Sequence, residues 1–88
     1  MLKIESGGHG DDGATLVLEG HLGGPWVDEL RRACETLLAS SPRLILDLGL
    51  VTFVDREGVE LLRALAGGRA MVTNCSPFVA EQLRASER

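Results

Sequence analysis

The chain has 88 residues and a formal net charge of −4, and with 44% apolar and 25% charged residues it has the composition of one ordinary globular domain, spanning residues 1–88. The scattered basic residues and the 3% aromatic content disfavour nucleic-acid binding, which needs clustered positive charge and rings for base stacking. No apolar run approaches a membrane span and no signal peptide opens the chain, so we expect a cytoplasmic protein without membrane insertion.

Two strands joined by a glycine-rich turn are predicted at the start of the chain. Met1–Ile4 is a short strand candidate, and Ala14–Leu22 alternates enough to form a second strand. The segment Ser6–Gly13, SGGHGDDG, has the glycine and aspartate content of an exposed turn. This order predicts an antiparallel hairpin.

A helix is predicted to begin at Pro25, because proline suits the first helical turn, where its missing N–H is not needed. It ends before the turn at 40–42. One face of this helix is apolar at helical spacing and comprises Trp26, Leu30, Ala33, Cys34, Leu37 and Leu38. Cys34 lies on that face, so we expect a small core residue and not a reactive or bridging thiol.

The segment from Leu44 to Leu65 is the most informative part of the chain. The apolar run at 44–46, resumed at 50–54 after Asp47, predicts a strand buried on both faces. Asp55 has the right chemistry to cap a helix that begins directly after it. That helix has apolar residues at helical spacing, and Gly67-Gly68 is a plausible stop.

A last strand and a last helix complete the expected order ββαβαβα. Arg69–Asn74 is a short strand candidate, after which Ser76 is expected to cap a helix over Pro77–Ala85. Helices between successive strands favour parallel pairing with right-handed crossovers. The predicted fold class is therefore α/β, with a mixed sheet that opens with an antiparallel hairpin and continues with parallel strands, and with helices packed on it.

The central segment resembles the STAS domain family, which includes anti-sigma factor antagonists. The family pattern is an apolar strand, Asp-Leu, an apolar stretch and Asp-Ser-Ser-Gly at the start of a helix. Asp47-Leu48, the run from Val51 to Asp55, and Gly58 match it here, and the segment at 75–79, CSPFV, is a second and weaker match. The resemblance implies a STAS-like domain that is shortened at its C-terminus, because the family usually continues with a further strand and helix.

The resemblance also implies where a partner would bind. In the family, the start of this helix contacts an anti-sigma factor that is also a kinase, and phosphorylation of a serine there breaks the complex. That serine aligns with Arg56 and the next serine with Glu57, so no phosphorylation is expected at the family position. The expected partner-binding residues are Asp55, Arg56, Glu57, Gly58, Glu60 and Arg63.

Catalysis and cofactor binding are not expected. His9, Asp11 and Asp12 match no spacing of a closed metal site, and a strand follows them where a phosphate loop needs a helix. His21 has no nucleophile and orienting acid placed convincingly near it, and Cys75 belongs to no Cys-x-x-Cys pair. We therefore expect no enzyme activity, no metal and no cofactor.

Two functional hypotheses follow. The first is a non-catalytic protein-interaction module resembling an anti-sigma factor antagonist, with an anti-sigma factor kinase as its partner and without the usual phosphorylatable serine. The alternative is a small STAS-like cytoplasmic subunit of a larger assembly, such as a lipid-transporting ABC complex. In that case another chain or a second copy would cover the sheet edge or helix face that the shortened C-terminus leaves open.

Overall fold

The computed structural model describes residues 1–10 and 13–85 of the chain. The elements follow in the order ββαβαβα, so the predicted fold class is confirmed. They are β1 (Leu2–Gly10), β2 (Gly13–Leu22), α1 (Pro25–Leu38), β3 (Leu44–Val54), α2 (Arg56–Ala66), β4 (Ala70–Thr73) and α3 (Pro77–Ala85). Within the described residues, the strands form one sheet in the order β1-β2-β3-β4.

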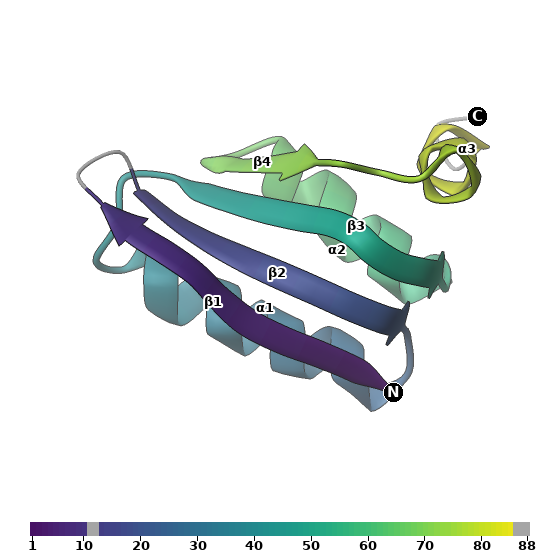
Figure 1. Cartoon of the computed structure of the whole chain (residues 1–88), viewed down its shortest axis with the longest axis horizontal. Coiled ribbons are helices and arrows are strands. Elements are labelled where there is room, and N and C mark those ends of the chain that lie inside the picture. The colour runs from purple at the N-terminus through teal and green to yellow at the C-terminus, as the bar shows by residue number, and fades with distance from the viewer. Residues whose placement is uncertain (11–12, 86–88) are drawn as a thin grey trace.

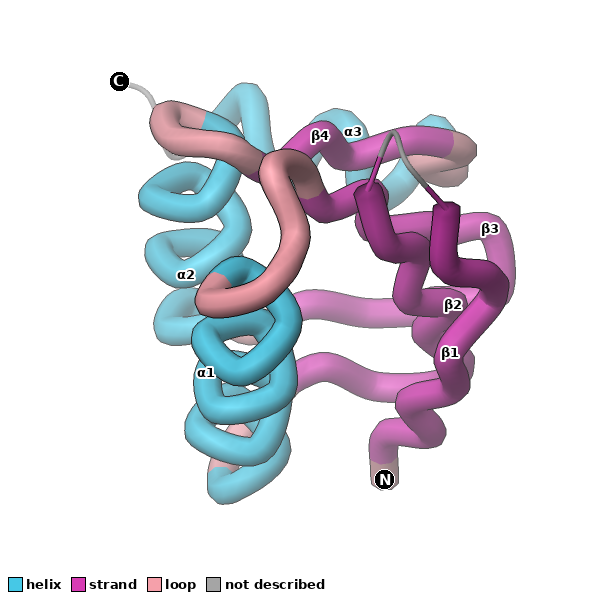
Figure 2. The backbone as a smooth tube through the Cα atoms, turned by 90° about the vertical axis from the view of Figure 1, so that its left-hand side faces the viewer, coloured by secondary structure: helices cyan, strands magenta, loops and turns pink. Residues whose placement is uncertain are grey.

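The sheet is mixed, as predicted. β1 and β2 are antiparallel, whereas β2, β3 and β4 pair in parallel. Helices α1 and α2 lie side by side on one face of the sheet (Figures 1 and 2). The core lies between these layers and includes Leu18, Leu30, Leu46 and Leu62, which are at most 1% exposed. None of the helices within residues 1–10 and 13–85 has the length and apolar character that a membrane span requires.

The opening hairpin is longer than the sequence predicts. β1 runs to Gly10, so residues 6–10 form a strand and the predicted turn at Ser6–Gly13 is wrong over this part. A bulge between Ser6 and Gly8 shifts the register, after which pairing continues to Gly10 opposite Gly13. Glycine disfavours strands because of its backbone entropy and because it has no side chain to pack. Here the backbone of this stretch is nevertheless held by its pairing with β2. Asp11 and Asp12, which the sequence analysis places in this turn, lie outside the described residues.

The prediction that β3 is buried on both faces is also wrong. Leu44, Leu46 and Leu48 face the helices and are fully buried, but Ile45 is 37% exposed and Leu50 is 56% exposed. Within the part of the chain that is described, no helix covers the other face of the sheet (Figure 2). Residues 44–47 alternate regularly, so Ile45 points to this open face, and the bulges further along β3 place Leu50 and Phe53 there as well.

Helix α3 covers the end of β3 that β4 leaves unpaired. β4 pairs only with residues 44–47 of β3. Further along, the side-chain amide of Gln82 donates to Val54 O at 2.6 Å and accepts from Val54 N–H at 3.1 Å, as a neighbouring strand would. Ser76 caps α3 as predicted, since its Oγ accepts from Val79 N–H at 3.2 Å.

Replacement of Gln82 by Met is expected to destabilise the fold by about 1–3 kcal/mol, because it leaves both backbone groups of Val54 without their partner. Urea denaturation measures the loss. The matched control is Glu81→Gln, which removes an exposed ion pair with Arg84 on the same helix and is expected to change stability by less than about 0.5 kcal/mol. Equal effects of the two variants would contradict the role assigned to Gln82.

Candidate functional site

Asp55 joins the starts of two helices at one corner of the molecule. Its Oδ1 accepts from Gly58 N–H at 2.8 Å, which caps α2 as predicted, and its Oδ2 accepts from Gly24 N–H at 3.0 Å. Gly24 is the N-cap residue of α1, which has no side-chain cap of its own. One carboxylate therefore satisfies donors at both helix N-termini and places its negative charge where the helix dipoles favour it.

Close packing at this corner requires glycine. A Cβ at Gly58 would lie 2.8 Å from Val54 Cγ1 and 2.9 Å from Leu22 O, and a Cβ at Gly23 would lie 2.7 Å from Asp55 Oδ2. Gly24 has a φ of 58°, which side chains disfavour. The glycines let α1 and α2 begin close to the ends of β2 and β3, and they bring both helix starts within reach of Asp55.

The predicted charged residues lie together on the outer face of α2. Arg56 and Glu60 are exposed by 93% and 67% at their side chains and form an ion pair of 3.6 Å one turn apart. Glu57 and Arg63 are exposed as well. Gly58 is buried beneath them. We refer to the set Asp55, Arg56, Glu57, Gly58, Glu60 and Arg63 as the docking corner, after the role that the sequence predicts for it. Its two acidic and two basic side chains on α2 make this helix face close to neutral.

An exposed aromatic cluster beside this corner was not predicted from the sequence. The rings of His21 and Phe53 have centroids 4.7 Å apart, and Phe78 lies 6.2 Å beyond Phe53. Phe53 and Phe78 remain 37% and 56% exposed. Gly23 lies between the cluster and the docking corner, because a Cβ on it would be 2.9 Å from His21 Nε2 and 2.7 Å from Asp55 Oδ2. The two surfaces therefore adjoin.

The sequence offers one indication of this cluster in retrospect. His21 and Phe53 are opposite each other in the parallel pairing of β2 and β3. That pairing depends on the two bulges in β3, because without their extra residues the register that starts at Ala14 and Leu44 would place His21 opposite Val51. Phe78 joins them from α3, which is distant in sequence.

Burial of both cysteines disfavours their thiolate forms. Burial raises the pKa of the Cys34 thiol to about 11, so Cys34 is a protonated core residue at neutral pH, and burial also raises the pKa of Cys75. No group of three or more His, Cys, Asp or Glu residues is gathered to hold a metal among the residues described here.

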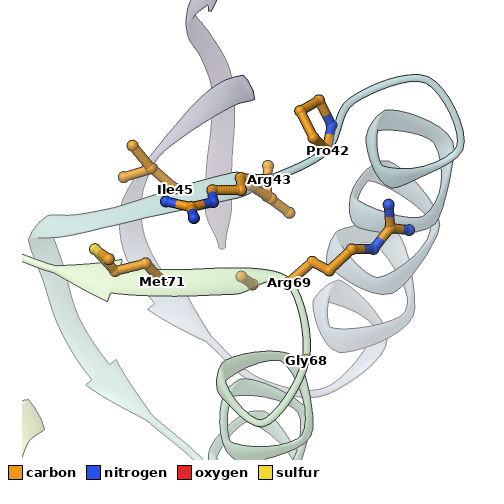
Figure 3. A pocket seen from close by; sticks show the side chains of 8 residues that line it. Pro42, Arg43, Ile45, Gly68, Arg69 and Met71 are labelled. Carbon is orange, nitrogen blue, oxygen red and sulfur yellow. The ribbon is translucent and has the colours of Figure 1, made fainter. Parts of the chain in front are cut away.

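A hollow lies at the starts of β3 and β4, at the end of β3 that is opposite to the docking corner. It has a volume of about 850 Å³ and is lined by the start of each strand, with Arg43, Ile45 and Met71 around it (Figure 3). Arg69 also borders it, but its guanidinium donates to Leu38 O at 2.9 Å and Ser41 O at 3.3 Å. Arg69 thus serves the C-terminal end of α1, and the hollow brings together no set of groups with an evident chemistry.

Solved structures share this fold. The chain is similar to the anti-sigma factor antagonist SpoIIAA in its unphosphorylated form, with a TM-score of 0.70 and 21% identity over 93% of this chain and 82% of that one. It is also similar to an uncharacterized Shewanella loihica PV-4 protein with a SpoIIAA-like fold, with a TM-score of 0.59 and 12% identity over 98% of this chain and 76% of the other. The expectation of a STAS-like fold is confirmed.

Comparisons at the level of sequence find nothing further: no protein-family model matches the chain, and no curated protein does. At identities of 21% and 12% the structural likeness establishes the fold.

Replacement of Asp55 by Ala is expected to destabilise the protein by about 2 kcal/mol, since donors at two helix starts lose their acceptor. Asp55→Asn is expected to cost less, because one amide oxygen remains to accept from one of the two N–H groups. Chemical denaturation gives the stability, and amide hydrogen exchange at Gly24 and Gly58 locates the loss. The control is Asp28→Asn, which affects an exposed residue in the first turn of α1. Unchanged exchange at Gly24 in Asp55→Ala would contradict the link between the helices.

Proposed function

We propose that this protein is a non-catalytic binding module that docks a protein partner through the docking corner, as an anti-sigma factor antagonist does. The observation that carries the proposal is the exposed first turn of α2, held rigidly by Asp55 and bordered by exposed aromatic rings. Rigid presentation favours binding, because little conformational entropy is lost when the partner arrives. The STAS-like fold supports this assignment, since SpoIIAA is an anti-sigma factor antagonist.

The chemistry of the surface fits a protein partner. Phe53 and Phe78 offer apolar area of the kind that lies at the centre of interfaces, and mixed charges on α2 offer a polar rim. The charges at Arg56 and Glu60 would set orientation and partner choice more than affinity.

The proposed module has no phosphorylation switch at the corner. No serine, threonine or tyrosine occurs between Val54 and Leu65, and Arg56 aligns with the phosphorylatable serine of the family. A phosphate there would add a charge of about −2. It would repel an acidic partner surface, and its desolvation would disfavour contact with an apolar one. Arg56 has the opposite sign, so it does not mimic the phosphorylated state, and we infer that the module is constitutively competent to bind.

The cytoplasm is the compartment that suits this role, because a kinase-type regulator of transcription works there. A subunit role in a larger assembly, such as a lipid-transporting ABC complex, is the alternative. It predicts binding through the sheet face or edge, so that changes at Arg56 and Glu60 would leave assembly intact.

The exchange variant Arg56→Glu with Glu60→Arg tests the corner. It preserves net charge and the pairing one helical turn apart, but it inverts the charge pattern that a partner meets. Binding to an anti-sigma factor kinase from the same cell, measured by calorimetry, is expected to weaken by about tenfold or more. The control exchange, Glu81→Arg with Arg84→Glu on α3, inverts another exposed pair and is expected to leave affinity unchanged. Unaltered affinity of the Arg56/Glu60 exchange would place docking elsewhere.

Incubation with the same kinase and ATP is expected to leave residues 54–65 without phosphate, because they contain no hydroxyl. Mass spectrometry of peptides covering this segment and the rest of the chain checks the result. Stoichiometric phosphorylation at another position that also abolishes binding would contradict the inference of constitutive binding.

A further inference from the structure

The outer edge of β1 is a regular stretch of strand with backbone groups available for pairing. β1 is the first strand of the sheet and pairs with β2 on its inner side. Within residues 1–10 and 13–85, no strand pairs with its outer side. The pairing is regular from Leu2 to Ser6, and a bulge follows directly. An unprotected edge of this kind is a template for another strand.

The hydrogen-bond pattern shows which residues face outward. His21 N–H donates to Met1 O at 2.9 Å, so Met1 and His21 form a hydrogen-bonded pair of the antiparallel ladder. Such pairs alternate along the ladder, and the next ones are Lys3 with Glu19 and Glu5 with Val17. The N–H and C=O groups of the intervening residues point away from β2. These residues are Leu2, Ile4 and Ser6.

The side chains of the same stretch form two sets. Lys3 and Glu5 lie on the open face of the sheet, are about 60% exposed, and form an ion pair of 3.0 Å. Edge lysines normally discourage pairing, but Glu5 neutralises this one, and together with Glu19 it raises the pKa of Lys3. Leu2 and Ile4 face the helix layer, where Ile4 is only half-buried.

We propose that a second copy of this chain adds to the edge, with β1 antiparallel to β1 and the two-fold axis beside Ile4. Each Ile4 then exchanges hydrogen bonds with its counterpart, and Leu2 exchanges them with Ser6 of the other copy. Lys3 stands opposite Glu5 of the other copy at both ends of the axis. The result is one sheet that continues through both copies, with the helix layers on the same side.

The charges select this register and favour self-pairing. A shift by two residues in either direction still matches outward N–H to outward C=O, but it places Lys3 opposite Lys3 or Glu5 opposite Glu5. Like charges directly opposite each other destabilise a pair of strands, whereas opposite charges stabilise it. The regular stretch runs from Leu2 to the bulge after Ser6, and Ile4 is the central residue of this stretch. A two-fold axis beside Ile4 therefore pairs the whole stretch with its counterpart in the other copy.

The dimer leaves the docking corner accessible, because α2 lies behind β3 and β4 and away from β1 (Figure 1). The inference therefore goes beyond the proposed function and does not depend on it. Failure of partner binding in the Arg56/Glu60 exchange and failure of dimerisation are separate results.

Analytical ultracentrifugation of the full chain over a wide concentration range tests the proposal. The wild type is expected to show a reversible monomer–dimer equilibrium. Lys3→Glu and Glu5→Lys each place like charges across the axis and are expected to raise the dimer Kd by about tenfold or more. An equimolar mixture of these two variants restores both opposite-charge pairs, so it is expected to form a heterodimer. The double exchange, Lys3→Glu with Glu5→Lys, is expected to dimerise like the wild type.

Amide exchange supplies an independent check of register, because the amides of Ile4 and Ser6 should become protected as concentration rises, while those of Lys3 and Glu5 are protected already by β2. A wild type that remains monomeric up to millimolar concentration overturns the proposal. So does a dimer that is indifferent to both single variants, since its interface lies elsewhere.

Discussion

The arrangement of this fold depends on the carboxylate of Asp55. The backbone N–H of Asp55 donates to Leu22 O at 3.0 Å, and the two carboxylate oxygens accept from backbone N–H groups at the starts of α1 and α2. The ends of two strands and the starts of two helices are thereby tied to one residue. A longer side chain at this position, or a Cβ at Gly58, would separate them. The shape of the docking corner is therefore a consequence of how the fold is closed.

The two bulges of β3 set the register at its end, where Phe53 lies opposite His21 and Val54 opposite Leu22. Asp47 Oδ1 accepts from Gly49 N–H at 2.9 Å at the first irregularity, and Thr52 Oγ1 donates to Gly20 O at 3.2 Å at the second. The first bulge reverses the alternation and turns Val51 inward, and the second restores it, so Phe53 faces outward and Val54 stays in the core. The two extra residues thus place the ring of Phe53 opposite His21, next to the charged helix.

Features governed by local chemistry could be predicted from the sequence, whereas features governed by pairing could not. Asp55 as a cap, Ser76 as a cap and the element order follow from short-range rules, and the structure confirms them. The length of β1 could not be predicted, because its glycine-rich half is held by backbone pairing with no side-chain pattern. The open face of the sheet was missed because a short continuous apolar run does not show whether one face or both are covered, and Ile45 within it faces outward.

The two proposals together supply a form of control that does not need phosphorylation. A hydroxyl is absent from residues 54–65, so a covalent switch at the corner is unavailable. A dimer paired through β1 would carry two docking corners, and a partner that is itself dimeric could engage both. The second contact then occurs at a high effective concentration, and avidity exceeds the affinity of one corner. Binding would thus depend on the cellular level of this chain relative to its dimer Kd, which makes expression the regulatory variable.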